Sequence, residues 1–409
     1  MEDLLFLAHR IPYPPDKGDK IRSWNILRYL ARSYRIHLGA FVDDPCDLRY
    51  QDKLESMCAS VHLLPLQPMT GRLRSLSGLG RKIPLSIPYY YDRRMKKWVD
   101  AQLEQDSLQR VFVFSSAMAQ YVMNSQMSSC RRVIDIVDVD SDKWRQYAQH
   151  KRWPLSWLYR REAECLLDFE EKVATLFDAS IFVSSAEAAL FRRLVPEASG
   201  RIVFLDNGVD QDYFSPERDY HNPYDDQAKV IVFTGAMDYW ANVHAVQWFA
   251  QYVFPRIREA VPAARFVIVG ARPASEVQRL VSAPGVEVTG AVPDVRPYLA
   301  HAHAAVAPHR IARGVQNKVL EAMAMAKPVL VTSAAVEGID FDDPRILLVA
   351  DDEHQMAEQA IRMLQLNTPA VVEGARQWIC QRYDWNLNLQ KLHELFEPFP
   401  GQPEHMTQT

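Results

Sequence analysis

The stretch from Val306 to Ser333, VAPHRIARGVQNKVLEAMAMAKPVLVTS, decides the fold class. It predicts a short apolar strand, a basic loop with Gly314, a helix that carries Lys318 and Glu321, and a second strand from Val329. Unpaired N–H groups at the start of a helix and the helix dipole both favour negative charge, and cationic side chains stand beside them here. The stretch therefore predicts an anion site, of the nucleotide-binding kind, in an α/β fold.

The length and composition of the chain limit the classes of protein it can be. At 409 residues it is too long for one ordinary core, so two domains are expected. Its 48% hydrophobic content supports packed cores and excludes a largely disordered chain. The formal net charge of −4 gives no general attraction for nucleic acid, so we expect no nucleic-acid partner and local recognition of any anionic ligand.

The cysteines and the N-terminus indicate a cytoplasmic protein. The five cysteines are odd in number, scattered and without a CxxC pair, which favours reduced thiols and no metal site. The first apolar run, Leu4 to Ala8, follows acidic residues and is too short for a signal peptide, so it predicts a first strand. No run of about 18 uncharged apolar residues occurs, so no transmembrane helix is expected.

Strand and helix patterns alternate along the chain in two series. The first series predicts a doubly wound domain over residues 1–206, and the second predicts another over 207–377. The polar stretch that begins with the Asn207–Gly208 turn signal predicts the hinge between them. An amphipathic helix over 378–396 is expected to pack back on the first domain, followed by a tail over 397–409.

Charged residues fill the loop after the first predicted strand, HRIPYPPDKGDKIR. Ligands of open α/β sheets bind at the carboxyl ends of strands, so Gly18, Asp19 and Arg22 are candidates for the acceptor side of a cleft. A solvated charged turn fits the same residues. His9, at the end of the strand, is a candidate base, although a capping or packing role is commoner for such a residue.

Residues 71–98, GRLRSLSGLGRKIPLSIPYYYDRRMKKW, interleave basic residues with aliphatic residues and a tyrosine triplet. This composition fits a surface that rests on an anionic membrane or meets a lipid-linked acceptor. The alternative is a solvated helix pair whose tyrosines pack inward. The first interpretation places the protein in the cytoplasm as a peripheral protein of the inner membrane face.

Four aspartates lie close together in DIVDVDSDKW, residues 135–144, at the end of a predicted strand. Alternating aspartates resemble hard-cation loops, but this segment lacks the glycine and distal glutamate of a calcium loop. Hydrogen bonds from Asp138 or Asp140 to sugar hydroxyls suit an acidic strand end that faces a cleft. Helix capping by Ser141 or Asp142 is the structural alternative.

Five segments in sequence order resemble motifs of one family. They are the PxDxGxxxR-like loop at Gly18, NGVDxxxF at Asn207, FTGAMDYWANVHAVQWF at Phe233, VTGAVPDVRPYL at Val288 and GVQNKVLEAMAMAKPVL at Gly314. On these segments the sequence resembles retaining GT-B glycosyltransferases, the glycosyl transferases group one that include sucrose synthases and polysaccharide-building enzymes. Within that family it looks most like bacterial sugar transferases of exopolysaccharide and PEP-CTERM systems. The resemblance implies an α/β GT-B fold: two facing doubly wound Rossmann-like domains, an interdomain cleft and a C-terminal crossing helix.

The resemblance also implies roles for individual residues. Glu321 would hold the ribose hydroxyls of a nucleotide-sugar donor, and Lys318 would neutralise its diphosphate. Both residues share a helix face, which agrees with these roles. The implied donor-binding set is Gly235, Asn242, Gly290, Val292, Arg310, Gly314, Val315, Gln316, Lys318 and Glu321.

The sequence departs from the family pattern at two places. The motif usually has two glutamates separated by seven residues, and the first position here is Arg313. The loop GAMDYWAN lacks the arginine and lysine that commonly contact the diphosphate. A leaving diphosphate needs cations or amides aimed at it, so we infer that Arg310 and Arg313 supply the charge.

The predicted activity is transfer of a sugar from a nucleotide-sugar donor to a glycan or lipid-linked acceptor with retention, without an obligatory metal or other cofactor. The candidate catalytic residues are Lys318, Glu321, Arg313, Asp138 and His9. A nucleotide-sugar epimerase has the same kind of fold and needs no acceptor. A non-catalytic binding protein is the other alternative, because the first glutamate of the motif is absent.

Overall fold

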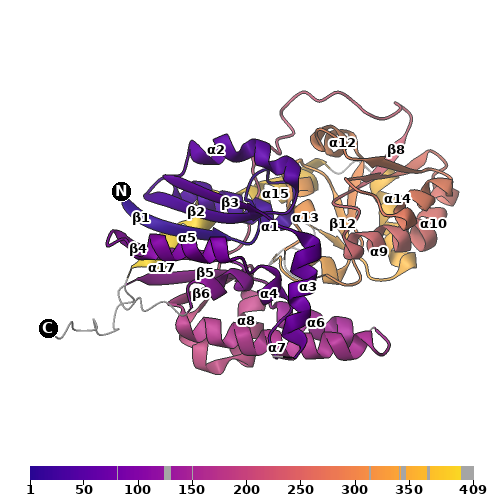
Figure 1. The fold of residues 1–409 in the computed structure, drawn as a ribbon. Helices are drawn as coiled ribbons and strands as arrows, with labels where there is room; N and C mark the ends of the chain where they lie inside the picture. Colours follow the sequence, from indigo (N-terminus) through magenta and orange to yellow (C-terminus); the bar gives the residue numbers. More distant parts are fainter. Residues whose placement is uncertain are drawn as a thin grey trace. The chain divides into compact units, whose positions relative to one another are not determined.

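The computed structural model describes residues 1–80, 82–123, 130–149, 151–312, 315–339, 341, 347–365 and 369–397. The chain divides into two compact units, each described here by itself (Figure 1). Unit 1 contains Met1–Leu205 and the chain from Leu389, and unit 2 contains Asp206–Asn388. Each unit is built around one parallel β-sheet.

The sheet of unit 1 has seven strands in the order β3-β2-β1-β4-β5-β6-β7. The strands are β1 (Glu2–Ala8), β2 (Tyr34–Val42), β3 (Ser60–Pro65), β4 (Leu108–Phe114), β5 (Arg131–Val137), β6 (Ala179–Phe182) and β7 (Ile202–Phe204). The helices are α1 (Gly18–Leu30), α2 (Gln51–Glu55), α3 (Pro68–Leu79), α4 (Ser86–Tyr89), α5 (Arg93–Leu103), α6 (Asp140–Gln149), α7 (Leu155–Leu176), α8 (Ser185–Leu194) and α17 (Lys391–Phe396).

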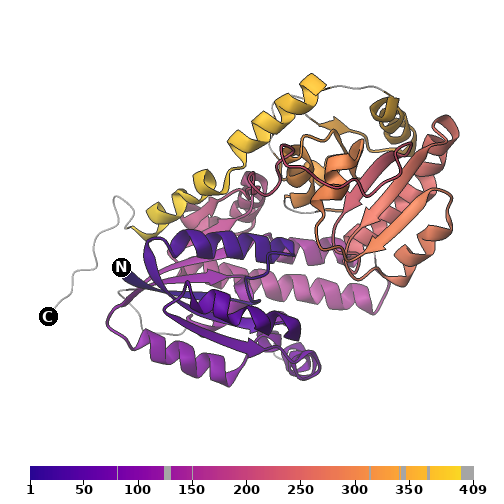
Figure 2. The ribbon, with the colours of Figure 1, turned by 90° about the horizontal axis from the view of Figure 1, so that it is seen from above.

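Side chains of a strand point alternately to the two faces of the sheet, and both sets are apolar here. Helices therefore cover both faces. On one face, a Cβ at Gly39 would lie 2.7 Å from Trp98 of α5, so glycine lets that helix approach β2 closely. On the other face, the ring of Phe112 stacks on Phe6 and lies 6.4 Å from the ring of Phe396 in α17. Figure 2 shows α17, in yellow, next to α1, in indigo.

The single helix expected over 378–396 is divided into three helices. They are the end of α15 (Pro369–Arg382), then α16 (Trp385–Leu389), then α17. The division occurs where the backbone at Tyr383 accepts a hydrogen bond from Val209 N at 2.7 Å and Asp384 pairs with Val209 in a β-bridge. The carboxylate of Asp384 then accepts from Leu387 N at 2.8 Å and starts the next helix.

The sheet of unit 2 has six strands in the order β10-β9-β8-β11-β12-β13. The strands are β8 (Lys229–Thr234), β9 (Ala264–Val269), β10 (Val286–Gly290), β11 (Ala304–Ala307), β12 (Val329–Val331) and β13 (Leu348–Val349). The other helices of the unit are α9 (Trp240–Trp248), α10 (Phe254–Ala260), α11 (Ser275–Gln278), α12 (Arg296–His301), α13 (Asn317–Ala324) and α14 (Glu353–Gln365).

The strand order of each sheet reverses direction once. Counted within its own unit, each sheet runs third, second, first, fourth, fifth, sixth, which is the order of a doubly wound Rossmann-like sheet, and unit 1 adds a seventh strand beside the sixth. The prediction of two such domains in an α/β chain is therefore confirmed. The reversal lies between β1 and β4 in unit 1 and between β8 and β11 in unit 2. Ligands of such sheets bind at the carboxyl ends of these central strands.

Candidate functional site

The reversal point of unit 2 gathers residues from three segments. Gly235 follows β8, His309 follows β11 by two residues, and Lys318 lies in the first turn of α13. Because β8 and β11 are hydrogen-bonded neighbours, their carboxyl ends bring the two loops together. The start of α13 then adds a helix dipole at the same edge of the sheet.

Lys318 is held by uncharged groups. Its Nζ donates to Asn242 Oδ1 at 2.6 Å and lies 3.3 Å from His309 Nε2. The same Nζ lies 4.3 Å from the centre of the Phe233 ring, a distance typical of a cation–π contact. Within the described residues Lys318 forms no ion pair within 4 Å, and the only charge that acts to stabilise its ammonium is that of Glu321.

Two glycines allow the loops to close around this lysine. A Cβ at Gly235 would lie 2.9 Å from Asn242 Nδ2 and 3.2 Å from Lys318 Nζ, and the residue has φ +153°. A Cβ at Gly270, which follows β9, would lie 1.7 Å from the carbonyl oxygen of Gly235. Larger residues at these positions would displace Asn242 or the β8 loop from Lys318.

His309 fixes the other side of Asn242. Its imidazole is 1% exposed, and its Nε2 lies 3.0 Å from Asn242 Oδ1. Burial, and then the charge of Lys318, hold the pKa of His309 well below its ordinary value, so the ring stays neutral. The tautomer with a proton on Nε2 donates to Asn242, whereas the other tautomer accepts from Lys318. In the first case His309 orients Asn242, and in the second it binds Lys318 directly.

Lys318 and Glu321 shift each other's pKa in a region where burial opposes both charges. Burial lowers the pKa of Lys318 to about 7, and the charge of Glu321 acts in the opposite direction. Burial raises the pKa of Glu321 to about 7, again opposed by its partner. Each charge would be stabilised by a ligand that supplies opposite charge or hydrogen bonds.

The loop between β10 and α12 lies on the Glu321 side. Gly290 has φ +71° and open space where a Cβ would be. Asp294 and Arg296 form a short ion pair, and the guanidinium of Arg296 lies 3.8 Å from the centre of the Tyr213 ring. Burial and then the charge of Asp294 raise the pKa of Tyr213, and Glu321 is close enough to contribute. This loop therefore presents an open glycine beside a rigid aromatic and ionic cluster.

The reversal point of unit 1 is occupied by a histidine and an aspartate. His9 Nε2 lies 3.2 Å from Asp19 Oδ2, and Arg10 Nη1 donates to the same oxygen at 2.7 Å. The His9 ring stacks on Phe114 and meets Tyr90 edge to face. Burial acts to raise the pKa of Asp19, but His9 and Arg10 outweigh it and hold the pKa below its ordinary value. Asp19, next to Gly18 in the first turn of α1, thus keeps an ionised carboxylate beside His9.

Arg22 lies inside unit 1, in contrast to the expectation that it lines an acceptor surface. It is 1% exposed, its Nε donates to Asp135 Oδ2 at 2.7 Å, and its Nη1 donates to Leu205 O at 2.8 Å. The carboxylate of Asp135 is fully buried. Arg22 therefore joins the ends of β5 and β7 from within, because a buried guanidinium needs such partners.

Asp138 follows a strained residue at the end of β5. Val137 has φ +74°, which is unusual for a β-branched residue, and its N–H donates to Asp135 Oδ1 at 3.1 Å. Burial raises the pKa of Asp138, and its Oδ1 is buried without a hydrogen-bond partner in the described residues. A sugar hydroxyl would satisfy this oxygen. As for the cation alternative, no group of three or more histidine, cysteine or acidic residues in the described ranges is placed to hold a metal ion.

Part of unit 2 matches a known protein family in sequence. Residues 228–366, which include Asn242, His309, Lys318 and Glu321, match the family described as Glycosyl transferases group 1. We call residues 228–366 the group 1 domain after this match. No curated protein sequence matches the chain.

Solved structures resemble the chain over nearly its whole length. Sucrose-phosphate synthase from Thermosynechococcus elongatus has a TM-score of 0.69 at 15% identity and covers 97% of this chain and 98% of its own. HepE of Anabaena, in complex with UDP-glucose, has a TM-score of 0.65 at 15% identity, with coverage of 96% and 99%. WaaG, a glycosyltransferase involved in lipopolysaccharide biosynthesis, has a TM-score of 0.64 at 17% identity, with the same coverage. At these identities the likeness shows the fold, which is GT-B.

The group 1 domain brings together four of the residues expected at the donor site: Gly235, Asn242, Lys318 and Glu321. Val315 and Gln316 lead directly into α13. Arg310, expected to supply positive charge, is exposed, and its guanidinium lies 5.8 Å from the centre of the Trp248 ring of α9. The expectations for Arg313 and Gly314 lie outside the described residues. Gly290 and Val292 belong to the separate loop between β10 and α12.

Sequence reasoning missed two residues of the site. Nothing in the sequence assigned a role to His309, because its partner Asn242 lies 67 positions earlier. Asn207, interpreted as part of a hinge turn, donates from Nδ2 to Asn317 Oδ1 at 3.0 Å and so anchors the first residue of α13. A Cβ at Gly208 would lie 2.6 Å from the Trp385 ring, so this turn is a packed segment of unit 2.

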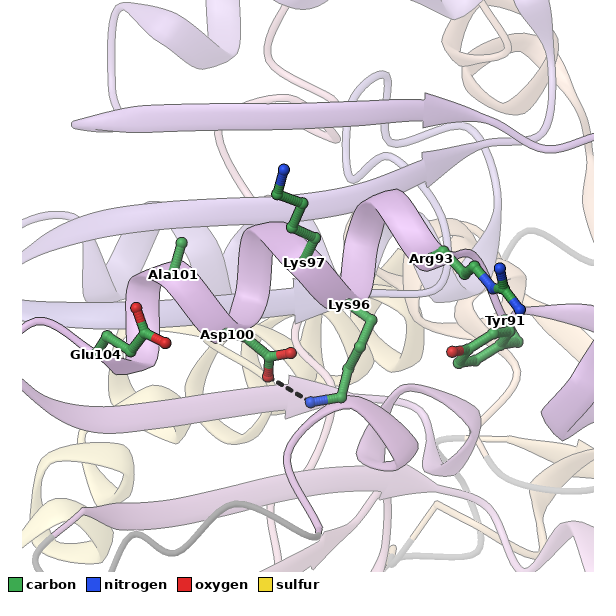
Figure 3. Close-up of a pocket in the computed structure, with 7 residues that line it drawn as sticks. All are labelled: Tyr91, Arg93, Lys96, Lys97, Asp100, Ala101 and Glu104. Carbon is green, nitrogen blue, oxygen red and sulfur yellow. Dashed lines mark hydrogen bonds and ion pairs between the residues drawn. The ribbon is translucent and has the colours of Figure 1, made fainter.

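A hollow of about 420 Å³ lies along α5 of unit 1 (Figure 3). Its lining comes from α5, Tyr91 and Glu104, and Figure 3 shows Lys96 paired with Asp100 along the helix. It holds none of the expected site residues. Across the described ranges no helix is long and apolar enough to span a membrane.

Affinity for a ligand that contains a diphosphate should fall as the pH rises through about 7, because burial lowers the pKa of Lys318 to about 7 and a diphosphate attracts the protonated amine. Below that pH the lysine is charged before the ligand arrives. Above it, each further pH unit should weaken binding by up to about tenfold, since protonation must accompany binding. Calorimetric titration with UDP-glucose as the probe, from about pH 6 to 8.5, measures this slope.

Two variants separate the lysine from its neighbour. Glu321→Gln removes the charge that acts to raise the pKa of Lys318, so the slope should move to lower pH. Lys318→Met should abolish the dependence of affinity on pH. An unchanged slope in Lys318→Met would show that another group titrates.

Proposed function

We propose that the protein is a glycosyltransferase that moves a sugar from a nucleotide-sugar donor to an acceptor hydroxyl with retention of anomeric configuration. The observation that carries the proposal is the group 1 domain with Lys318 held at the start of α13 by Asn242 and His309. A cation at the start of a helix whose hydrogen-bond partners are uncharged suits a diphosphate, because the diphosphate supplies negative charge. The UDP and UDP-glucose complexes of HepE support a nucleotide-sugar donor.

The donor is proposed to lie along the carboxyl edge of the unit 2 sheet. Its diphosphate would bind Lys318 and the first amides of α13, and its ribose hydroxyls would bind Glu321. The loop from Gly290 to Val292 would hold the base, for which the open space at Gly290 leaves room. Arg310 and Arg313 are proposed to add charge when the diphosphate binds.

The chemical step exchanges one C–O bond for another. The bond from the anomeric carbon to the diphosphate breaks, and negative charge develops on the leaving oxygen, where Lys318 and the helix amides stabilise it. The acceptor hydroxyl attacks from the face that the diphosphate leaves, so configuration is retained. Its proton passes to the departing phosphate oxygen or to a protein base. The proposal requires no metal.

The acceptor is proposed to bind unit 1, at the carboxyl edge of its own sheet. Asp138 has a buried oxygen that lacks a partner among the described residues, and His9 is oriented by Asp19. Both groups can accept a hydrogen bond from a sugar hydroxyl. We propose a glycan or lipid-linked glycan as the acceptor, as in bacterial exopolysaccharide or cell-surface glycan synthesis.

The proposal is tested first by donor binding and then by transfer. We expect one nucleotide sugar of a UDP, GDP, ADP and dTDP panel to raise the melting temperature, since a ligand at 100 times its Kd stabilises by about 2.7 kcal/mol. With that donor and a panel of lipid-linked glycans, product should form with the donor's anomeric configuration by NMR. Glu321→Gln should melt like the wild type without ligand but show a smaller ligand-induced shift. Conversion of the sugar without acceptor would identify an epimerase, and binding without turnover would identify a binding protein.

A further inference from the structure

Large apolar side chains are exposed on two adjoining elements of unit 1. On α3 the exposed fractions are 80% for Met69, 67% for Leu73 and 59% for Leu76. At the start of α7 they are 81% for Trp153 and 58% for Trp157. Such a concentration of apolar surface on a soluble unit indicates a contact surface. We call these five residues the apolar surface of unit 1.

The α3 residues form a single outward stripe. Their spacing of four and three positions places them on one face of the helix. The opposite face packs inward through glycines: a Cβ at Gly71 would lie 2.9 Å from the Tyr89 ring, and one at Gly78 would lie 2.9 Å from Ile83 O. The glycine face of α3 therefore packs against the rest of unit 1, and the apolar stripe lies on the opposite face.

The two elements are joined by hydrogen bonds, so their exposed residues belong to one region. Arg161, one turn after Trp157, donates to Ile83 O at 3.1 Å. Glu162 accepts from Leu85 N at 2.7 Å, and its carboxylate is 5% exposed. These bonds fix the α3–α4 connection to the first turns of α7, which start beside the two tryptophans.

Positive charge predominates in the same region, although Glu162 is buried beside Arg161 and Glu164 is exposed on the next turn of α7. Residues 56–91 contain four arginines and lysines, residues 143–161 contain six, and neither segment contains an aspartate or glutamate. The chain as a whole has a formal charge of −4, so this positive charge is local. Arg72, Lys82, Arg152 and Arg160 are exposed around the apolar surface.

We propose that this surface docks on an anionic lipid bilayer. Leucine and methionine side chains on one face of a helix enter the boundary between headgroups and acyl chains, and tryptophan favours that interface because its ring is apolar and its N–H is polar. Arginine and lysine attract anionic headgroups, each by about 1 kcal/mol near the surface. Apolar side chains among predominantly basic ones fit this occupant. The inference concerns lipid binding and does not depend on the proposed reaction.

The region differs from the segment 71–98 suggested by the sequence. Within that segment, Tyr90 packs inward against His9 and Phe41, and burial raises its pKa to about 12. Tyr90 thus follows the inward-packing alternative, whereas Tyr91 is exposed and α3 keeps its exposed stripe. Trp153 and Trp157 lie outside 71–98 and adjoin α3 only through the fold.

Flotation of the full-length protein with vesicles tests the proposal. At about 0.15 M salt, where screening is moderate, we expect at least about tenfold more protein on phosphatidylglycerol–phosphatidylcholine vesicles than on phosphatidylcholine alone. The variants Leu73→Ser/Leu76→Ser, Trp153→Ser/Trp157→Ser and Lys151→Glu/Arg152→Glu should each lower binding about tenfold or more. About 0.5 M salt should weaken wild-type binding.

A matched control and a second measurement separate docking from misfolding. Tyr252→Ser/Val281→Ser removes two apolar side chains of unit 2 that are 57% and 55% exposed, and it should leave binding unchanged. Each variant should keep the wild-type melting temperature. Brominated lipids should quench the wild-type tryptophan fluorescence but not that of Trp153→Ser/Trp157→Ser. Equal binding to neutral vesicles, no binding, or a wild-type dimer that Leu73→Ser/Leu76→Ser dissociates would each overturn the proposal.

Discussion

Replacing Lys318 with methionine should slow sugar transfer by about 10²–10³-fold in kcat/KM, the loss that follows removal of one group stabilising a developing anion. The ammonium is held at 2.6 Å by Asn242 and has no carboxylate partner among the described residues, so the diphosphate is its natural counter-charge. Lys318→Arg should recover little, because the cradle of Asn242, His309 and Phe233 is shaped for a compact charge. Initial rates at several donor concentrations give the required ratio.

The folded state should tolerate this change. Burial lowers the pKa of Lys318, which means that the charged lysine is less stable here than in water. Methionine is similar in length and removes that unfavourable charge, so the melting temperature should stay within a few degrees or rise. A variant that retains full activity would show that the diphosphate binds elsewhere, and one that unfolds would leave Glu321→Gln as the test of the same site.

Replacing Arg22 with methionine should lower the free energy of unfolding by about 3–5 kcal/mol, which is typical when one partner of a buried ion pair is removed. Arg22 is 1% exposed, and Asp135, fully buried, would keep an uncompensated carboxylate. The carbonyl of Leu205 would also lose its donor. Urea unfolding at neutral pH, followed by circular dichroism, measures the change.

Two controls identify the cause of this loss. Arg22→Met/Asp135→Leu removes both charges and should recover much of the stability, since apolar replacement of a whole buried pair is often neutral. Arg362→Met breaks the exposed pair with Glu358 on α14 and should cost less than about 0.5 kcal/mol. If Arg22→Met folds as well as the wild type but loses acceptor binding, the arginine acts in the site and the structural role is wrong.

Local sequence patterns were sufficient for the fold class and for part of the site. The continuous apolar run Leu4–Ala8 became a strand because both faces of a parallel sheet are buried. The helix with Lys318 and Glu321 follows a loop and precedes an apolar strand, so its place at a sheet edge was readable from one stretch. The residues at that edge could be predicted because they lie close together in the sequence or belong to motifs of the family.

Contacts between distant residues could not be read in this way. Arg22 and Asp135 are 113 positions apart, and no local pattern distinguishes a buried arginine from an exposed one in a charged loop. Asn207 and Asn317 are 110 positions apart, and the NG pair has the composition of an ordinary turn. The helix expected over 378–396 is interrupted because Val209, far earlier in the chain, binds the backbone at Tyr383.

The return of the chain to unit 1 at Leu389 has a consequence for the order in which the protein is made. Unit 2 occupies one uninterrupted run of chain, so all of its strands have left the ribosome by the time Asn388 emerges. Unit 1 begins first, yet the ring contacts of Phe112 and Tyr34 with Phe396 must wait for the last helix. Domains generally fold as units during synthesis. Here the unit whose synthesis begins first is the one completed last.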